Sequence, residues 1–456
     1  MAALPDSGTV RSRTVQRDWN RRYPVAERGE GVYIWDKAGK RYIDGSGGSS
    51  VVTSIGHGVK EIPEAMYQQA QKISFVPAHA FANEWALKLG DLVAEWAPGE
   101  MRNACKTWFG CTGTDAVESA LRLARSHFVE KGRPSKHLII SRWQSFHGNS
   151  IGTAGAHGFT FRRRYFTPMY VGNPHIPPAY CFRCYFEKTY PDCNLLCARS
   201  LEKEIRQHGP ENVAAFIAEP VVGAALVCTP APAGYFEIIR HICSEYDVLF
   251  IADEVMTGWG RTGKFWGVDH WNVTPDIITT AKGMSSGYTP ISATIARDSV
   301  WEPLESKGAA FRAGHTLNYN PVSCAGACAN IQYLVERRLW ENAAEVGDYM
   351  LARMATLVSH RIVGDVRGRG LMLGVEFVAD KRTKAYFPAE QRIARRLEDA
   401  ALQRGLIVYS STGCVDGIAG DMILLAPPLI ITRGQVDELV AILDEAIGAV
   451  EDELAI

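Results

Sequence analysis

A carboxylate and an amine stand at the ends of two apolar runs. Together they have the chemical groups needed to form a covalent imine with a carbonyl compound and to stabilise it. Asp253 lies near the end of the run Val248–Val255, and Lys282 ends the run Asp276–Lys282. A lysine amine forms an imine with an aldehyde only when deprotonated, which a partly buried position favours. A carboxylate beside a pyridine nitrogen keeps that nitrogen protonated, because an opposite charge favours the charged form. Taken singly, the two residues also fit a surface lysine and a capping or ion-paired aspartate.

A third element combines small and hydroxyl-bearing residues at a predicted helix start. Thr112, Gly113 and Thr114 precede apolar positions that repeat with helical spacing up to Arg125. The first N–H groups of a helix have no partners within it and lie at the positive end of its dipole, so a phosphate binds well there. The same residues also fit an ordinary capping box between Thr112 and Asp115, and the motif alone leaves both interpretations open.

Short apolar runs alternate with amphipathic helical patterns through the middle of the chain. These runs cover residues 137–141, 213–220, 248–255, 276–282 and 291–296. Because they are apolar throughout rather than alternately, they predict strands buried on both faces of a parallel sheet, with the helices covering those faces in an α/β architecture. Ligands in such sheets bind beyond the carboxyl ends of the strands, which is where Asp253 and Lys282 stand.

The two ends of the chain have a different pattern from the middle. A hairpin is predicted over residues 31–44, a long helical stretch over 325–360, strands over 370–377 and 405–410, and a last helix with a capping box between Thr432 and Gln435. We expect a loose arm over the first dozen residues. The predicted domains are 1–75 (arm and part of a small domain), 76–330 (large domain) and 331–456 (small domain).

Several motifs occur in an order that resembles one enzyme family. They are "TGTDAVESA", "SFHG", "IAEPVVGA", "IADEVMTGWGRTG", "TTAKG", "GHTLNYNPVSCAGA" and "VRGRGLMLGVEF". The chain is similar over nearly its whole length to the class III, or ω-, aminotransferases, which use pyridoxal phosphate and have fold type I. The resemblance implies a large domain with a mostly parallel sheet flanked by helices, and a smaller α/β domain formed by the N- and C-terminal parts.

The resemblance also implies an activity. An amino group would move from an amine or ω-amino acid to a keto acid such as pyruvate. Decarboxylase, racemase and aminomutase reactions on the same scaffold stay open as alternatives, because a fold does not determine its reaction.

Roles for individual residues are implied by the resemblance in the same way. Lys282 would bind the cofactor covalently and transfer protons, and Asp253 would hold its ring nitrogen. Phe146 would stack on the ring, where many relatives have tyrosine, and His147 follows it. The other implied contacts are Thr112, Gly113 and Thr114 with the phosphate, Val255 with the second ring face, Glu219 near the hydroxyl edge or beside a substrate-binding arginine, and Thr316 with the phosphate of a neighbouring subunit. The last contact implies a homodimer.

The substrate pocket departs from the family pattern. Many relatives carry a carboxylate-binding arginine where Tyr409 stands here, and some amine-selective relatives carry a tryptophan near Ser50. Phe81 is the third candidate substrate contact. These departures predict a roomier pocket. The basic triplet Arg162–Arg164 has two interpretations: a solvated loop, or a source of the missing cation.

Two further motifs suggest rival functions. Residues 258–265 follow the spacing of a triphosphate-binding loop, but Phe265 stands where a Ser or Thr must bind Mg²⁺. Four cysteines, Cys181, Cys184, Cys193 and Cys197, have spacings that suit either free thiols or a structural zinc site; we predict no catalytic metal.

Composition narrows the class of protein. With 49 basic and 50 acidic residues, the chain has no charge excess that would favour nucleic acid or an anionic membrane. No secretory signal or membrane-length apolar run is visible. The eleven cysteines are odd in number and mostly isolated, which indicates reduced thiols and a cytoplasmic protein.

Overall fold

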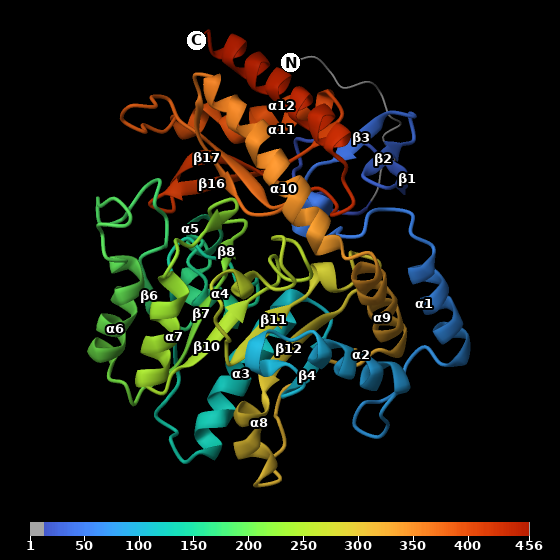
Figure 1. The fold of residues 1–456 in the computed structure, drawn as a ribbon, viewed down its shortest axis with the longest axis vertical. Coiled ribbons are helices and arrows are strands. Elements are labelled where there is room, and N and C mark those ends of the chain that lie inside the picture. Colours follow the sequence, from blue (N-terminus) through green and yellow to red (C-terminus); the bar gives the residue numbers. More distant parts are fainter. Residues whose placement is uncertain (1–12, 456) are drawn as a thin grey trace.

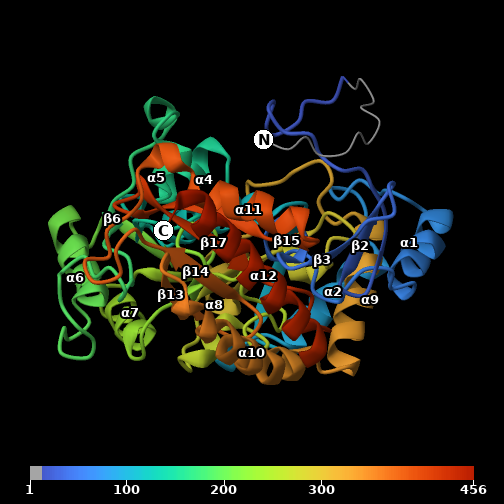
Figure 2. The same ribbon diagram turned by 90° about the horizontal axis from the view of Figure 1, so that it is seen from above.

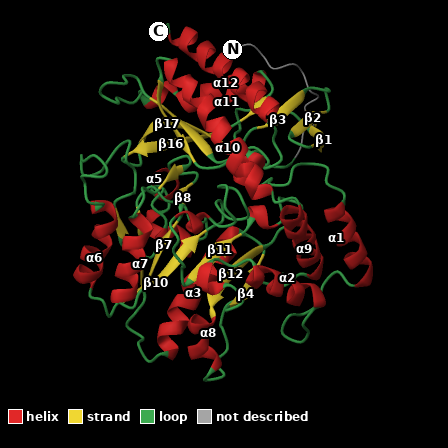
Figure 3. Cartoon of the chain, viewed as in Figure 1, coloured by secondary structure: helices red, strands yellow, loops and turns green. Residues whose placement is uncertain are grey.

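The computed structural model describes residues 13–455, so the predicted arm over the first dozen residues lies outside them. Figure 1 shows two stacked parts: a large sheet with its helices below, and a smaller part above that is built from both ends of the chain. Figure 3 shows the strands of the large sheet running between helices, which confirms the predicted α/β class. No helix within the described range is long and apolar enough to cross a membrane.

The large sheet has seven strands in the order β4-β12-β11-β10-β7-β5-β6. Their bounds are β4 Cys105–Gly110, β5 Leu138–Arg142, β6 His175–Ile176, β7 Val213–Ala218, β10 Leu249–Asp253, β11 Ile277–Thr280 and β12 Ser292–Arg297. All five predicted apolar runs are strands. β12 nevertheless runs antiparallel to both of its neighbours, unlike the parallel strand its composition suggested. The connection over residues 281–291 contains no α-helix, and a parallel crossover needs a longer one.

Helices cover both faces of this sheet, and alternate residues of each strand face them. α3 (Gly113–Glu130) and α8 (Asp298–Glu305) share one hydrophobic cluster with Ile217 and Ile251. On the other face Phe250 stacks on Phe236 of α7 (Tyr235–Glu245), beside α6 (Leu196–His208). The strands are therefore apolar throughout because each face meets a helix.

The smaller part joins sequence-distant segments. The predicted hairpin is β2 (Tyr33–Asp36) and β3 (Arg41–Asp44), flanked by β1 (Ala26–Glu30) and by β15 (Leu406–Ile407), which runs parallel to β3. A second sheet has the order β13-β14-β17-β16, with β13 Val363–Gly368, β14 Leu373–Phe377, β16 Tyr409–Val415 and β17 Ala419–Leu425. Figure 2, from above, shows α11 (Ile393–Gln403) and α12 (Arg433–Leu454) lying over these sheets. The capping box of Thr432 and Gln435 is confirmed at the start of α12.

One long helix predicted from the sequence is two separate helices in the structure. The stretch 325–360 consists of α9 (Pro321–Glu336) and α10 (Leu339–Ala355), followed by a short 3-10 turn. Arg338 has a φ of 49°, in the left-handed region, so the helical path stops there. The other helices are α1 Glu61–Lys72, α2 Glu84–Glu95, α4 Ile151–Ala156 and α5 Thr160–Arg163, and a two-stranded ribbon joins β8 (Val221–Val222) to β9 (Thr229–Pro230).

His360 anchors α12 through two carboxylates and should make stability depend on pH. Its ring nitrogens lie 3.0 Å from Asp444 and 2.9 Å from Glu451. Burial lowers the pKa of His360, but hydrogen bonds and charges from these carboxylates outweigh it, so the pKa is raised. The stabilisation is full below the unfolded pKa of about 6.5 and is lost as pH rises through the raised folded value.

We therefore expect His360→Gln to lower the free energy of unfolding by about 0.5–1 kcal/mol at mildly acidic pH and by much less at alkaline pH. Urea denaturation at two pH values measures the difference. His241→Gln, at a side chain that is 80% exposed, is the matched control. An equal loss at both pH values would contradict the assignment.

Candidate active site

The predicted catalytic residues meet at the carboxyl edge of the large sheet. Asp253 is the last residue of β10 and pairs in register with Thr279 of β11, and Lys282 lies two residues after the last residue of β11. Glu219 follows β7, the strand on the other side of β10. Because these strands are parallel, their ends bring the three side chains to one place.

Lys282 has the environment of a reactive amine. It opens the short 3-10 turn Lys282–Met284, and its φ is 40°, which is uncommon for a residue with a side chain. Its amine forms no hydrogen bond or ion pair with any residue in the described range. Burial lowers the pKa of Lys282 to about 8, although the charges of Asp253 and Glu219 oppose the change. A large deprotonated fraction is therefore present at mildly alkaline pH.

Asp253 is buried and held by two donors. His147 Nδ1 lies 2.7 Å from Asp253 Oδ2, and the amide of Val255 donates to Oδ1 over 3.1 Å. A carboxylate offers about four lone-pair positions, so Asp253 keeps acceptor capacity for a further N–H group. The Nε2 atom of His147 is buried without a hydrogen-bond partner. A buried orphan of this kind is costly unless a ligand completes it.

Glu219 links the end of β7 to the segment that carries Phe146. One carboxylate oxygen accepts from the Phe146 amide over 3.0 Å, and the other accepts from the Gly223 amide over 2.8 Å. Burial raises the pKa of Glu219, and nearby Asp253 adds to the rise. Glu219 therefore positions the backbone under the Phe146 ring; within the described range it pairs with no arginine side chain.

The start of α3 combines a cap with free donors. The capping box is confirmed: Thr112 Oγ1 accepts from the Asp115 amide, and Asp115 accepts from the Thr112 amide. The amides of Gly113 and Thr114 have no acceptor within the described range. A β-carbon at Gly113 would lie 2.9 Å from Val255 Cγ1, so only glycine allows this approach. The capping interpretation is therefore confirmed, and the free N–H groups at this helix start are compatible with the phosphate interpretation, which stays a prediction.

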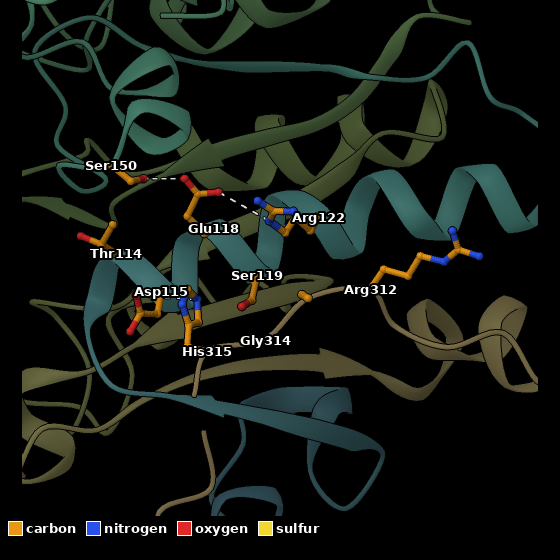
Figure 4. Close-up of a pocket in the computed structure, with 10 residues that line it drawn as sticks. Thr114, Asp115, Glu118, Ser119, Arg122, Ser150, Arg312, Gly314 and His315 are labelled. Carbon is orange, nitrogen blue, oxygen red and sulfur yellow. Dashed lines mark hydrogen bonds and ion pairs between the residues drawn. The ribbon is translucent and has the colours of Figure 1, made fainter. Parts of the chain in front are cut away.

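A cavity of about 620 Å³ opens beside the first turns of α3. Figure 4 shows Thr114 and Ser150 on one side of it, and His315 pointing toward Asp115, whereas the Arg312 guanidinium points away from the first turn. His315 Nε2 lies 3.7 Å from Asp115. The segment that carries Thr316 therefore runs close to the predicted phosphate end of α3.

These residues fit pyridoxal phosphate. The free amides at the start of α3 suit its phosphate, Asp253 with spare acceptor capacity suits its ring nitrogen, and the unpartnered amine of Lys282 suits its aldehyde. The half-buried Val255 stands between Gly113 and Asp253, where it can contact a ring.

The three arginines of the basic triplet Arg162–Arg164 have different surroundings. The Arg162 guanidinium donates to the Tyr409 hydroxyl over 3.0 Å and lies 5.3 Å from the centre of the Phe146 ring. Arg163 instead donates to the His157 carbonyl, and Arg164 is exposed. The solvated-loop interpretation is therefore wrong for Arg162.

Three other candidates form no hydrogen bond with Lys282 or Asp253 among the described residues of the one chain, and two of them are exposed. Ser50 is half-buried, with its hydroxyl 4.0 Å from the sulfur of Met256. Phe81 is 64% exposed, and Thr316 is exposed as well.

Both rival motifs lose their support. No α-helix begins in or directly after residues 258–265, as a triphosphate-binding loop requires; only the short 3-10 turn Gly267–His270 follows, and Phe265 packs among Trp96, Trp259 and Trp340. The triphosphate interpretation is therefore wrong. The four clustered cysteines are free thiols, and the described residues include no group of three or more His, Cys, Asp or Glu placed to hold a metal ion.

Arg261 is a residue that the sequence analysis missed. It is buried, and its guanidinium donates to the carbonyls of Thr53, Leu371 and Pro427. It thus ties the segment after β10 to the smaller part of the molecule, and its charge contributes to lowering the pKa of Lys282. The available signal was an arginine inside a glycine- and tryptophan-rich run, which had been assigned to the rival phosphate loop.

Comparison with known proteins agrees with this geometry. The family model for class III aminotransferases matches residues 15–447. An uncharacterized aminotransferase, YodT of Bacillus subtilis, is 37% identical over 95% of this chain and 96% of its own length. The putrescine–pyruvate aminotransferase of Pseudomonas aeruginosa is 33% identical over 92% of this chain and 91% of its own.

A similar solved structure contains bound pyridoxal phosphate. An amine transaminase from an uncultivated Pseudomonas species, in its pyridoxal-phosphate-bound form, superposes with a TM-score of 0.89 at 30% identity, covering 97% of this chain and 99% of its own. The chain therefore belongs to the class III aminotransferases, enzymes of fold type I that use pyridoxal phosphate to move an amino group from an amine to a keto acid.

Proposed function

We propose that the protein is an ω-aminotransferase in which Lys282 and Asp253 are the catalytic residues and pyruvate is an acceptor. The observation that carries this proposal is the meeting of the unpaired Lys282 amine with buried Asp253 at the ends of adjacent strands. The putrescine–pyruvate relative supports an amine donor and pyruvate as substrates. The decarboxylase, racemase and aminomutase alternatives receive no support from any of the relatives reported above.

Each residue of the site has a separate proposed role in binding the cofactor or in moving a proton. Bound pyridoxal phosphate supplies an electron-withdrawing ring that stabilises negative charge at the substrate carbon. Lys282 would hold the cofactor at its aldehyde, and its amine would carry a proton to and from the substrate carbon. Asp253 would keep the ring nitrogen protonated, and His147 holds Asp253 in place. Phe146 and Val255 would contact the two ring faces, and Gly113 and Thr114 would bind the phosphate.

Two half-reactions followed by absorbance test this function. The holoenzyme mixed with an ω-amine such as putrescine should lose its visible absorbance, and pyruvate should restore it with formation of alanine. An enzyme that released carbon dioxide or a racemised amino acid instead would contradict the aminotransferase assignment.

We also propose a cytoplasmic homodimer whose active sites are shared. Apolar side chains are exposed near Thr316, among them Phe81, Leu87 and Leu317, at 64%, 62% and 53%. Beside them a cavity of about 680 Å³ is lined by Phe81, Trp108, His315 and Tyr319 together with neighbouring residues. Exposed apolar surface of this extent favours a partner, and a second copy would bring Thr316 and Phe81 to the other subunit's site. The free cysteines support a reducing compartment.

Thr316→Ala should weaken cofactor retention by roughly 1–3 kcal/mol, because a hydrogen bond to a charged phosphate is lost. Equilibrium dialysis of pyridoxal phosphate measures the effect, and sedimentation of apoenzyme and holoenzyme at low concentration shows whether cofactor stabilises the dimer. Thr356→Ala, where an exposed hydroxyl donates to the Arg353 carbonyl, is the control. A fully active monomer would refute the shared site.

The domain boundaries 75 and 330 stay proposals. Limited proteolysis of the holoenzyme, followed by mass spectrometry of the fragments, would place them.

A further inference from the structure

We propose that Arg162, oriented by Tyr409, binds the carboxylate of the keto acid acceptor, and of an amino acid donor that carries one beside its reacting carbon. The inference rests on the proposed aminotransferase function and names the recognition element of its pocket. The proposed ligand is a small 2-oxo acid with a free carboxylate. The proposed binding group, Arg162, lies beside the ring of Phe146.

The fold places Arg162 at the active site from a separate element. α5 packs against β16, which brings Arg162 to Tyr409 although 247 positions separate them in the chain. The guanidinium lies 5.3 Å from the Phe146 ring and 5.5 Å from the Phe159 ring. It is also close enough to Lys282 for its charge to contribute to lowering the pKa of that amine. The guanidinium therefore lies beside the ring of Phe146 and in electrostatic reach of the Lys282 amine.

The charge of Arg162 is uncompensated within the described part of the chain. Its guanidinium has one hydrogen-bond partner there, the neutral Tyr409 hydroxyl, and no carboxylate within ion-pair distance. A guanidinium offers five N–H donors in a planar fork, so most of them remain free to hold a carboxylate bidentately. Arg163 differs, because its side chain is taken up by the His157 carbonyl and by His175.

Aromatic neighbours make the position suitable for recognition rather than for a structural ion pair. A cation over the faces of Phe146 and Phe159 is stabilised by the rings without being neutralised. Tyr409 belongs to the β16–β17 hairpin, and its hydroxyl fixes the fork from the smaller part of the molecule. The carboxylate-binding cation of this chain therefore comes from α5, while Tyr409 acts as a positioning residue.

The test compares acceptors with and without a carboxylate. For Arg162→Met, the ratio of second-order rate constants for pyruvate and for a carboxylate-free aldehyde such as butanal should fall about 30- to 100-fold, because charge-assisted hydrogen bonds to the carboxylate are lost. Binding of the unreactive carboxylate propionate to the holoenzyme, measured by calorimetry, should weaken by a similar factor. Arg164→Met, at the exposed neighbour, should change neither quantity by more than about twofold.

Tyr409→Phe separates orientation from charge. Losing the hydroxyl leaves the cation in place, so the same ratio should fall only about 3- to 10-fold. Circular dichroism and retained cofactor absorbance show that each variant is folded.

The failure of this inference can be told from a failure of the proposed function. If wild-type holoenzyme transaminates and Arg162→Met keeps the wild-type preference for pyruvate over butanal, Arg162 does not bind the carboxylate. If wild-type protein neither retains cofactor nor transfers amino groups, the proposed function itself fails.

Discussion

Lys282→Ala should remove both the visible absorbance of the purified holoenzyme and nearly all transamination. The variant loses the amine that binds the cofactor covalently and the base that moves the proton, and the loss of a positioned base alone costs about 10²- to 10⁴-fold in rate. We expect turnover to fall by at least about 10³-fold. The measurements are the absorbance spectrum and single-turnover rates with putrescine.

Borohydride reduction identifies the residue that binds the cofactor covalently. In wild-type protein, mass spectrometry should find the reduced cofactor on the peptide that contains Lys282. In the Lys282→Ala variant, no peptide should carry it. Lys264→Ala is the matched control, because that exposed amine donates only to the Asp269 carbonyl and lies outside the proposed site. A reducible linkage that persists in Lys282→Ala would place the covalent bond on another residue.

Asp253→Asn should leave the cofactor bound and slow the proton shift by about 10²- to 10⁴-fold. Asparagine keeps the size of the side chain, and its single oxygen can still accept from either the Val255 amide or His147, whereas its amide nitrogen can only donate. It carries no charge, so it no longer favours the protonated ring nitrogen, and the ring withdraws electrons less strongly. Stopped-flow rates of the amine half-reaction measure the effect.

A half-buried aspartate, Asp269, provides the control for this removal of charge. Asp269 caps the short helical turn after Trp266 through a backbone hydrogen bond and lies outside the proposed site. Asp269→Asn should therefore alter stability more than rate. If Asp253→Asn retained near-normal turnover, its carboxylate would be a structural group that supports His147, and the ring nitrogen would need another partner.

Local patterns in the sequence were sufficient to predict the main strands, the capping boxes and the candidate residues of the site. Apolar runs such as 213–220 and 248–255 could be read as buried strands because burial on two faces leaves a local signature in composition. The capping boxes at Thr112 and Thr432 were equally local, since their partners lie three residues away. Family motifs then supplied the roles proposed for Lys282 and Asp253, and the positions of the two residues at the ends of neighbouring strands fit those roles.

Contacts between residues far apart in the chain could be known only from the folded structure. The direction of β12 depended on how residues 281–291 turn back, and the break at Arg338 depended on one backbone angle within an otherwise helical pattern. Whether Arg162 is solvated or faces the site depends on Tyr409, which belongs to another part of the chain. Such contacts are long-range, and a guanidinium has the same sequence signature in water as over an aromatic ring, so composition and spacing cannot distinguish the two environments.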